Sequence, residues 1–278
     1  MITPTKAAAI FLLMATAASA SAHDLFVYFS PPMAVKSQAA TAIINNGTFD
    51  ESAGAVTWAR LRDVSLRRDG ATIKPDSASW KEVGKQSQLT VLPAGEGTIL
   101  LGVSTLASTT KLTAAKFGAY LKLEDLPDTL ATYDAEEFPN GVTYSYTKHA
   151  RAIGQVGNLL TDDFAASLGY PLQIRLLRNP GSVKVGERLK FQVLNGETPV
   201  PNLRVYVGHR ADKPAEGDHG SATLVRTNAN GEAEFDVGAA KTWYIHTNHM
   251  VPSTQPGLDF VSDRASLTFE ILPHHAHP

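Results

Sequence analysis

The sequence predicts a mainly β protein, with two immunoglobulin-like or transthyretin-like β-sandwich domains and a short helix in the first. Short apolar runs separated by turn residues recur along the chain, which is typical of sandwich strands. Leu189, Phe191 and Val193 alternate with polar residues, so we expect a strand with one buried and one wet face. Only between Thr113 and Leu123 do apolar residues follow helical spacing.

The first half of the chain combines these strands with two glycine turn signals. We expect turns at Asn46-Gly47 and Asp69-Gly70, because glycine tolerates positive φ. The stretch from Pro127 to Gly141 is polar, and we expect it to be irregular. The predicted strands of this half are Leu25–Phe29, Ala39–Ile44, Val64–Arg68, Thr72–Lys74, Gln88–Leu92, Thr98–Ser104 and Val142–Val156.

The second half is a more regular series of strands. Turns are predicted at Asn179-Pro180-Gly181, Asn195-Gly196 and Asn230-Gly231. A boundary near Asn158 to Gly169 would divide the chain into an N-terminal β-rich domain, residues 23–165, and a C-terminal sandwich, residues 166–273. The predicted strands of the second half are Leu172–Leu177, Arg188–Leu194, Leu203–Gly208, Ala222–Thr227, Ala233–Val237, Thr242–Asn248 and Ser266–Leu272.

Residues 1–22 have the pattern of a cleaved secretory signal peptide. Lys6 precedes the apolar run Ala7–Ala18, and Ala20-Ser21-Ala22 is a small-residue cleavage site. The run is too short to cross a bilayer as a helix, and no later stretch is long enough. We therefore expect no membrane span after processing. With no cysteine in the chain, the expected location is a bacterial periplasm.

Composition and motifs argue against several classes of function. Without cysteine there are no disulfides, thiolate nucleophiles or cysteine-based zinc sites. The formal net charge of −2 gives no reason to expect a nucleic-acid partner. Phosphate-binding glycine loops, Gly-x-Ser-x-Gly elbows and His-Glu-x-x-His helices are absent from the sequence. Met33 and Met250 are the only methionines after the leader, which disfavours a thioether-rich Cu(I) site.

His23 follows the cleavage site directly. Cleavage after Ala22 would give it a free α-amine, and an amine and an imidazole on one residue can chelate a transition metal. Cleavage after Ala20 would instead give Ser-Ala-His, whose nitrogens form a square-planar site that suits Cu(II) and Ni(II). The alternative is that His23 only follows a small-residue cleavage site and binds nothing.

Several short motifs occur in a characteristic order along the chain. They are Ala22-His23-Asp24, Tyr146–Gly157, Gly169–Ile174, Asn179-Pro180, Gly186-Glu187, Leu194–Val200, Thr227–Gly231, Trp243-Tyr244-Ile245 ahead of His249-Met250, and Ala265–Phe269.

In this order and spacing the motifs resemble the NikM-like family of periplasmic domains, which is associated with nickel and cobalt uptake. The resemblance implies that His23 and His249 are metal ligands and that a membrane transporter component is a partner. Two positions depart from the family pattern: Phe260-Val261 replaces a usual Trp-Glu pair, and Asn228 replaces a common Asp. These changes weaken the case for acidic or calcium contacts at both places.

The role of His249 can also be interpreted from strand geometry alone. Strand alternation places it on the face of Trp243, and places His246 on the opposite face. A regular strand therefore disfavours chelation of one metal ion by His246 and His249 together, although a bulge would permit it. The alternative for His249 is a hydrogen-bonded core histidine.

Three further groups of residues are weaker candidates. The loop His209–His219 contains His209, Asp212, Glu216, Asp218 and His219, and the tail at 274–278 contains three histidines. Both could bind metal loosely, or simply be solvated. The residues Tyr144, Tyr146, Lys148 and Arg151 could line a ligand cleft, but we favour a half-buried strand with a wet face.

The sequence therefore predicts a non-catalytic periplasmic metal-binding protein, for nickel, cobalt or copper uptake or delivery, with His23 and His249 as ligands. One alternative is a copper-dependent oxidative enzyme with an N-terminal histidine chelate. Another is a structural or interaction module of a transport system, in which every histidine is incidental.

Overall fold

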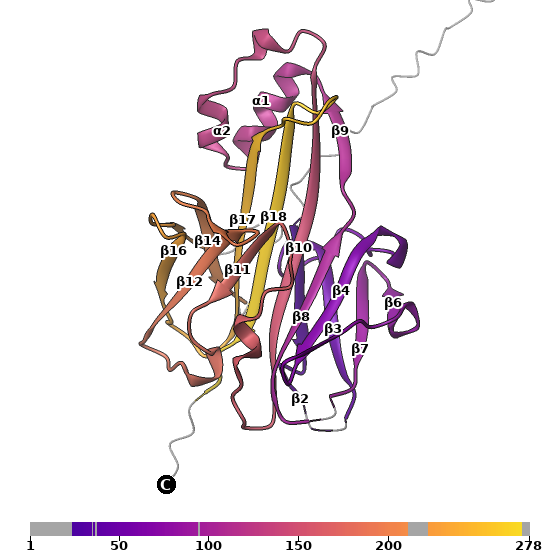
Figure 1. The fold of residues 1–278 in the computed structure, drawn as a ribbon, viewed down its shortest axis with the longest axis vertical. Coiled ribbons are helices and arrows are strands. Elements are labelled where there is room, and N and C mark those ends of the chain that lie inside the picture. The colour runs from indigo at the N-terminus through magenta and orange to yellow at the C-terminus, as the bar shows by residue number, and fades with distance from the viewer. Residues whose placement is uncertain (1–23, 35, 37, 94, 211–221, 274–278) are drawn as a thin grey trace, which may run out of the picture.

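The computed structural model describes residues 24–34, 36, 38–93, 95–210 and 222–273. These residues are mainly in strands, as predicted. A ten-stranded sheet runs through the middle of the molecule and carries a smaller sheet on each half (Figure 1). None of the helices in the described residues is long and apolar enough to cross a membrane.

The central sheet contains strands from both halves of the chain. Its strands, in spatial order, are β15 (Thr223–Arg226), β14 (Arg204–His209), β17 (Thr242–Pro252), β18 (Phe260–Glu270), β10 (Val142–Val156), β8 (Gly97–Thr105), β4 (Leu61–Arg68) and β5 (Ala71–Ile73). The short strands β2 (Met33–Ala34) and β9 (Ser108–Leu112) also pair with β10. The two halves join where β10 and β18 run parallel, from Tyr144 opposite Phe260 to Ala152 opposite Thr268.

The N-terminal sheet covers the first half of the central sheet. Val27, Ile44 and Leu89 of this sheet are buried against Leu101 and Val103 of β8. This burial of apolar side chains between two layers is the main source of stability in a sandwich. The strands of the N-terminal sheet, in spatial order, are β1 (Asp24–Ser30), β3 (Ala40–Gly47), β7 (Gln86–Val91) and β6 (Trp80–Val83).

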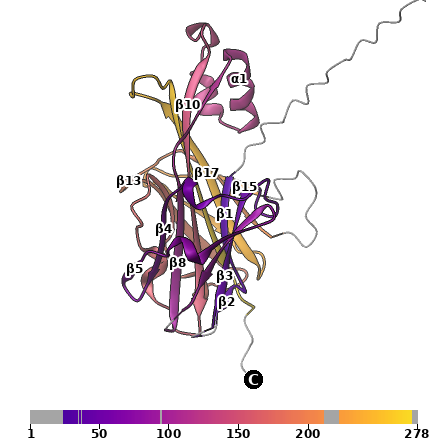
Figure 2. The ribbon, with the colours of Figure 1, turned by 90° about the vertical axis from the view of Figure 1, so that its right-hand side faces the viewer.

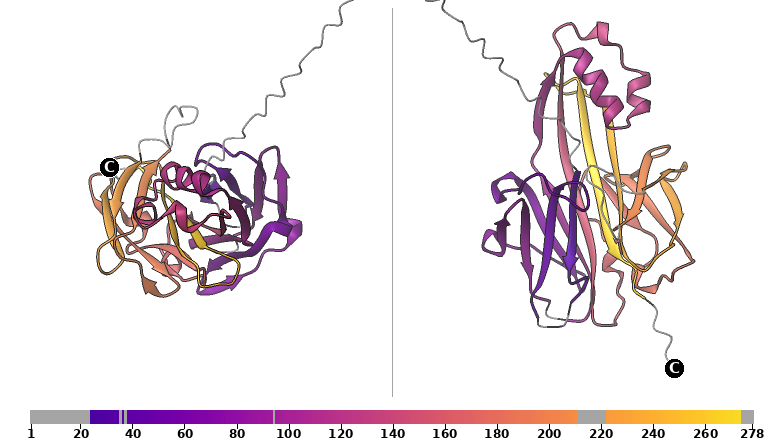
Figure 3. Two further views of the ribbon diagram at one scale, coloured as in Figure 1. Left: turned by 90° about the horizontal axis from the view of Figure 1, so that it is seen from above. Right: turned by 180° about the vertical axis from the view of Figure 1, so that it is seen from behind.

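The C-terminal sheet covers the other half in the same way. Its residues Ile174 and Phe191 pack in one core with Ile245, Leu267 and Phe269 of the central sheet. In the view from above, the two smaller sheets lie on either side of the central sheet (Figure 3). The C-terminal strands are β11 (Leu172–Leu176), β12 (Arg188–Asn195), β13 (Thr198–Pro199) and β16 (Glu232–Asp236), which pairs with β12.

A helical lobe lies at one end of the molecule, where β10, β17 and β18 extend beyond the two sandwiches (Figures 1 and 2). It contains α1 (Ala114–Leu123), as predicted, and α2 (Pro127–Ala131), in the stretch predicted to be irregular. Thr113 begins α1 by accepting a hydrogen bond from the Lys116 backbone N–H, which satisfies an otherwise unpaired donor. The described part of the chain also contains five 3₁₀ turns: η1 (Trp58–Arg60), η2 (Ser77–Ser79), η3 (Ala135–Glu137), η4 (Asp162–Ala165) and η5 (Pro180–Ser182).

Of the two glycine turns predicted in the first half, one is present and one is not. Asp69-Gly70 forms the β4–β5 hairpin turn, with positive φ at both residues. Asn46-Gly47 lies inside β3 instead, where Gly47 pairs with Asp24. A side chain at Gly47 would collide with the backbone oxygen of Glu51, so this glycine permits close backbone approach rather than a turn.

The prediction of a wet face on β10 is wrong. Tyr144 is 5% exposed, Lys148 9% and Arg151 1%, because β10 is a central strand with covers on both faces. The Arg151 guanidinium donates to the backbone oxygens of Ile174 (2.7 Å) and Ala166 (2.5 Å). It thereby ties the β10 backbone to residues on the far side of the predicted domain boundary.

Candidate functional site

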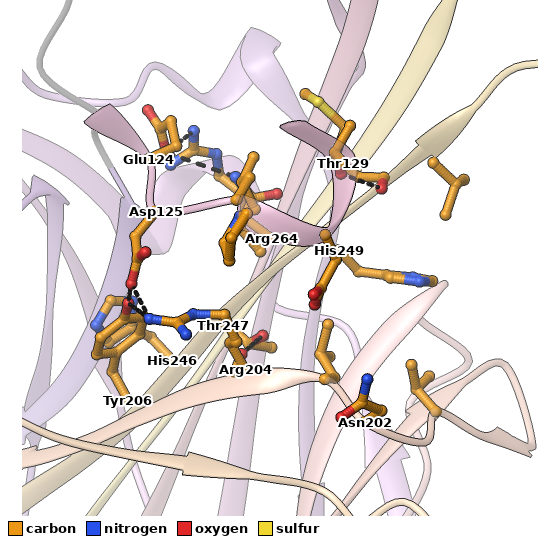
Figure 4. A pocket seen from close by; sticks show the side chains of 18 of the residues that line it. Glu124, Asp125, Thr129, Asn202, Arg204, Tyr206, His246, Thr247, His249 and Arg264 are labelled. Atoms are coloured by element: carbon orange, nitrogen blue, oxygen red, sulfur yellow. Dashed lines mark hydrogen bonds and ion pairs between the residues drawn. The ribbon is translucent and has the colours of Figure 1, made fainter. Parts of the chain in front are cut away.

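A cavity of about 450 Å³ lies between the α1–α2 connection, β14 and the part of β17 that extends beyond β14 (Figure 4). β14 ends its pairing with β17 at Tyr206 opposite His246, so the edge of β17 beyond this point is open to the cavity. Polar residues gather at one end of the lining, among them Asp24, His246 and Arg264. Apolar residues such as Leu126 and Met250 line the rest, together with the polar residues Thr129, Asn202 and His249.

Asp24, the first described residue, joins this cavity from the start of β1. Hydroxyl groups of β18 hold the β1 backbone in place: Ser266 donates to the Leu25 oxygen at 2.5 Å and Thr268 donates to the Val27 oxygen. The Asp24 carboxylate lies 2.8 Å from Nδ1 of His246 and 3.0 Å from the Arg264 guanidinium. Burial alone would raise the pKa of Asp24, but His246 and Arg264 outweigh it and hold this pKa well below its usual range.

Arg264 links Asp24 to the helical lobe. It donates to Glu124 at 2.5 Å and to the Tyr120 hydroxyl at 2.9 Å, and its side chain is 7% exposed. Glu124 is buried more deeply, with 3% of its side chain exposed, and burial raises its pKa despite the charge of Arg264. Its second oxygen, Oε1, is buried without a hydrogen-bond partner in the described chain.

Arg204 of β14 forms a second charged group in the cavity. Its guanidinium and the Tyr206 hydroxyl both donate to Asp125, and Tyr206 also stacks on the His246 ring with centroids 5.3 Å apart. Nε of Arg204 is buried and has no partner among the described residues. An unpaired buried donor or acceptor costs about 1–3 kcal/mol. Two residues that line the cavity therefore each carry one such buried atom, a donor on Arg204 and an acceptor on Glu124.

His249 lines the cavity from the other face of β17. The β17–β18 register is unbroken from Thr242 to Pro252, so His246 and His249 point to opposite sides of the sheet, as predicted (Figure 4). Burial lowers the pKa of His249, although the charge of Asp263 opposes this. His23 lies outside the described residues, so its pairing with His249 stays a prediction. Asp24, one residue later, contacts His246.

A second buried polar network lies on the His249 face of the sheet. Ser104 Oγ is 2.9 Å from Nδ1 of His149, and Nε2 of His149 is 3.2 Å from Asp263. The order serine, histidine, carboxylate is that of a hydrolase triad. Ser104, however, is completely buried, and it is not among the residues that line the cavity. We therefore assign this network a structural role.

The remaining predicted candidates are only partly described. His209 packs edge-on against Trp243 at 4.9 Å, whereas Asp212, Glu216, Asp218 and His219 lie outside the described residues. The histidines of the tail at 274–278 lie outside them as well. Tyr144 belongs to the apolar core of the helical lobe, and Lys148 donates to Asn46 at 2.6 Å.

The donors in the cavity fit a metal ion only in part. Nδ1 of His246 is engaged by Asp24, which leaves Nε2 as its free ligand atom, the usual arrangement of a metal-binding histidine with a carboxylate behind it. Within the described ranges, however, no three His, Asp or Glu side chains form a metal-binding group. A complete ligand set would need donors from outside these ranges.

Sequence reasoning passed over Asp24, His246 and Arg264 as functional residues. His246 points away from His249, and Asp24 enters only as the residue after His23 in the motif Ala22-His23-Asp24. Arg264 carried a partial signal, since the strand Phe260–Glu270 is small or apolar apart from Asp263, Arg264 and Glu270. A charge in such a strand needs a buried partner.

Comparisons with known proteins identify one family model and distantly similar solved structures. A family model described as "Domain of unknown function (DUF4198)" matches residues 20–251, and no curated protein matches the chain. Similar solved structures include the D0-D1 domain of intimin, at 12% identity over 89% of this chain and 97% of that one, with a TM-score of 0.20. A protein of Corynebacterium diphtheriae described as membrane-anchored has 12% identity over 92% and 60%, with a TM-score of 0.24. We draw no inference from likenesses this distant.

Proposed function

The chain belongs to the family described as a domain of unknown function (DUF4198), and we propose that it is an exported protein that binds a transition-metal ion for uptake or delivery. The ion is held at the polar end of the cavity by His246 and by the α-amine and imidazole of His23, once the leader has been removed after Ala22. The proposal assigns the protein no catalytic activity.

The observation that carries this proposal is the contact between Asp24 and His246. Asp24 is joined to His23 by one peptide bond, so the Cα atoms of these two residues are 3.8 Å apart or closer. The carboxylate of Asp24 fixes the tautomer and orientation of His246, leaving Nε2 to bind a metal ion. A histidine prepared in this way therefore contacts the residue that directly follows the predicted mature N-terminus.

The charges around the cavity also favour a cation. Four carboxylates and two guanidiniums line it, and Arg226 outside the lining pairs with Asp128, which leaves a formal excess of one negative charge with the histidines neutral. Nearby carboxylates stabilise a positive charge most strongly where water is scarce. The cavity therefore supports a divalent ion better than an anion.

The identity of the ion rests on two separate arguments. The resemblance to NikM-like domains points to nickel or cobalt and to a membrane transporter component as the receiver of the ion. Amine and imidazole donors bind Cu(II) most tightly by the general affinity order of divalent metals. All three ions therefore belong in the test.

The test is calorimetric titration of mature protein, its N-terminus checked by sequencing, with Ni(II), Co(II) and Cu(II). We expect saturable binding of one ion per chain. The variants His23→Ala and His246→Ala should each weaken binding at least tenfold, because each removes a nitrogen ligand. The matched comparison is His249→Ala, which removes the same side chain from the opposite face of β17.

Each outcome of this titration decides the assignment. Loss in His249→Ala with normal binding in His246→Ala would support the pairing of His23 with His249 and overturn the role of His246. Absence of saturable binding by any of the three ions would overturn the function itself. In that case a structural or interaction module of a transport system would be the better interpretation.

A further inference from the structure

The cavity passes around the open edge of β17. Its lining includes His246 on one face of this strand and His249 on the other, because β14 stops pairing with β17 at Tyr206. The volume of about 450 Å³ lies in the range of sites that hold small organic molecules, about 300–1,000 Å³. An ion bound beside His246 would occupy only a small part of it, so room for an organic molecule remains at the end lined by His249.

Apolar side chains make up much of the lining, and some of them are left exposed. Val251 is 39% exposed and Leu123 is 59% exposed, although both line the cavity. A ligand with an apolar body would cover such surface, and removing apolar surface from water favours binding. Further apolar residues of the lining are Leu126, Val200, Leu203 and Met250.

His249 brings unused hydrogen-bonding groups to this lining. Within the described ranges neither nitrogen of its ring has a hydrogen-bond partner, and neither is among the fully buried unpaired side-chain atoms. Both nitrogens are therefore accessible. The ring lies between Thr129 and Asn202, away from Tyr206 and His246 (Figure 4). A neutral imidazole has one N–H donor and one acceptor nitrogen, so it can anchor a ligand through either.

The surroundings of His249 disfavour a charged ligand. Burial lowers the pKa of His249 although Asp263 lies opposite it in the β17–β18 register, so a positive charge is disfavoured here. A negative charge would be repelled by the Asp263 carboxylate. The carboxylates and guanidiniums of the lining are already paired with one another or with Arg226, so none is left to neutralise a charged ligand. A neutral molecule fits these conditions best.

We propose that the His249 end of the cavity binds a neutral organic molecule with an apolar body and one hydrogen-bonding group, which His249 anchors. The apolar lining covers the body of the ligand, and the imidazole fixes its orientation. His246 and His249 lie on opposite faces of β17, so this ligand is separate from the metal ion. The inference therefore does not depend on the proposed function.

The experiment compares two fluorescent probes that differ in a single group. N-phenyl-1-naphthylamine is neutral and aromatic, has one N–H donor, and becomes brighter in apolar surroundings. The matched probe is 8-anilinonaphthalene-1-sulfonate, which is the same molecule with a sulfonate added. Mature protein without added metal is titrated with each probe at neutral pH. We expect saturable binding of one neutral probe per chain, and at least tenfold weaker binding of the sulfonate.

Two variants locate the bound probe. His249→Phe keeps an aromatic ring but removes both nitrogens, and the loss of one hydrogen bond should weaken binding of the neutral probe about fivefold. His209→Phe is the matched control, because His209 packs against Trp243 outside the lining, and it should leave the affinity unchanged. Thr132→Trp places a large side chain at an exposed position of the lining and should weaken binding at least tenfold.

Each result supports or overturns the inference. Equal or tighter binding of the sulfonate would overturn the assignment of a neutral ligand. Unchanged affinity in both His249→Phe and Thr132→Trp would place the probe elsewhere and overturn the site, and a loss in Thr132→Trp alone would overturn the role of His249 as the anchor. If His249→Phe does not fold, the comparison of the two probes and Thr132→Trp still decide. None of these failures affects the metal titration, so the proposed function is judged separately.

Discussion

Replacing Arg264 by methionine tests the charge cluster that positions Asp24 and His246. The guanidinium is 7% exposed and bonds to two carboxylates, those of Asp24 and Glu124. Methionine fills similar space without a charge, so Glu124 would be left buried without a cation and Asp24 would keep only His246. Breaking a buried ion pair in this way costs about 3–5 kcal/mol. For a protein of this size, this corresponds to a decrease in Tm of about 6–20 °C.

The assay is thermal unfolding followed by circular dichroism between pH 4 and 8. In wild type, the low pKa of Asp24 contributes stability above the unfolded value of about 3.9, and this is lost as the pH falls through the folded value. In Arg264→Met, burial should raise the pKa of Glu124 further above its unfolded value, so the variant recovers as the pH falls. We therefore expect the difference between wild type and variant to be largest near pH 7 and to narrow towards pH 4.

The matched control is Arg188→Met. Arg188 also bonds to two carboxylates, Glu234 and Asp236, but its side chain is 65% exposed. We expect no measurable change in Tm there, because exposed ion pairs contribute little. Equal, pH-independent effects in the two variants would refute the reasoning that the Arg264 cluster is a buried electrostatic unit.

Three further predictions concern stability. Burial lowers the pKa of Lys148 to about 8 from 10.5, so the folded state binds fewer protons than the unfolded state between these pH values. The stability of wild type relative to Lys148→Met should therefore rise by up to about 3 kcal/mol between pH 8 and 10.5. A stability difference that does not change with pH in urea denaturation would contradict this. Gly102→Ala would place a methyl 2.6 Å from the Tyr170 hydroxyl and should cost about 1–3 kcal/mol, whereas Gly54→Ala, with open space around it, should be neutral in the same denaturation. Arg151→Met should lose about 1.5–3 kcal/mol of stability for each of the two hydrogen bonds that Arg151 donates to backbone oxygens. The net loss is smaller than this sum, because the variant no longer buries a guanidinium. An unchanged Tm would show that these bonds do not tie the two halves together.

Strands and helices that bury their own side chains could be predicted from the sequence. The strand predicted at Arg188–Leu194 and the helix predicted between Thr113 and Leu123 both match, because strand alternation and helical spacing reflect local burial. β6 (Trp80–Val83) and β9 (Ser108–Leu112) were missed. Both are short and rich in polar residues, and they are strands because they pair with β7 and β10.

The shared central sheet had no local signal in the sequence. β10 and β18 pair in parallel across more than a hundred intervening residues, and nothing in either segment specifies that partner. A domain boundary drawn from turn residues near 165 could therefore not reveal that the same sheet continues on both sides of it.

The candidate site was predictable in kind but not in detail. A histidine after the predicted leader and a histidine in a late strand could be found by inspection. Whether His246 or His249 faces Asp24 depends on how β1 lies across β18, and this contact is held by the hydroxyls of Ser266 and Thr268. Hydroxyl-to-backbone contacts between distant segments leave no periodic pattern.

Electron paramagnetic resonance of Cu(II)-loaded mature protein tests the central claim most directly, because it counts the nitrogen atoms bound to the ion. The account predicts coupling to three nitrogens, the α-amine and imidazole of His23 and the imidazole of His246, with one fewer in His246→Ala and no change in His249→Ala. A spectrum that is the same in wild type and His246→Ala would contradict it.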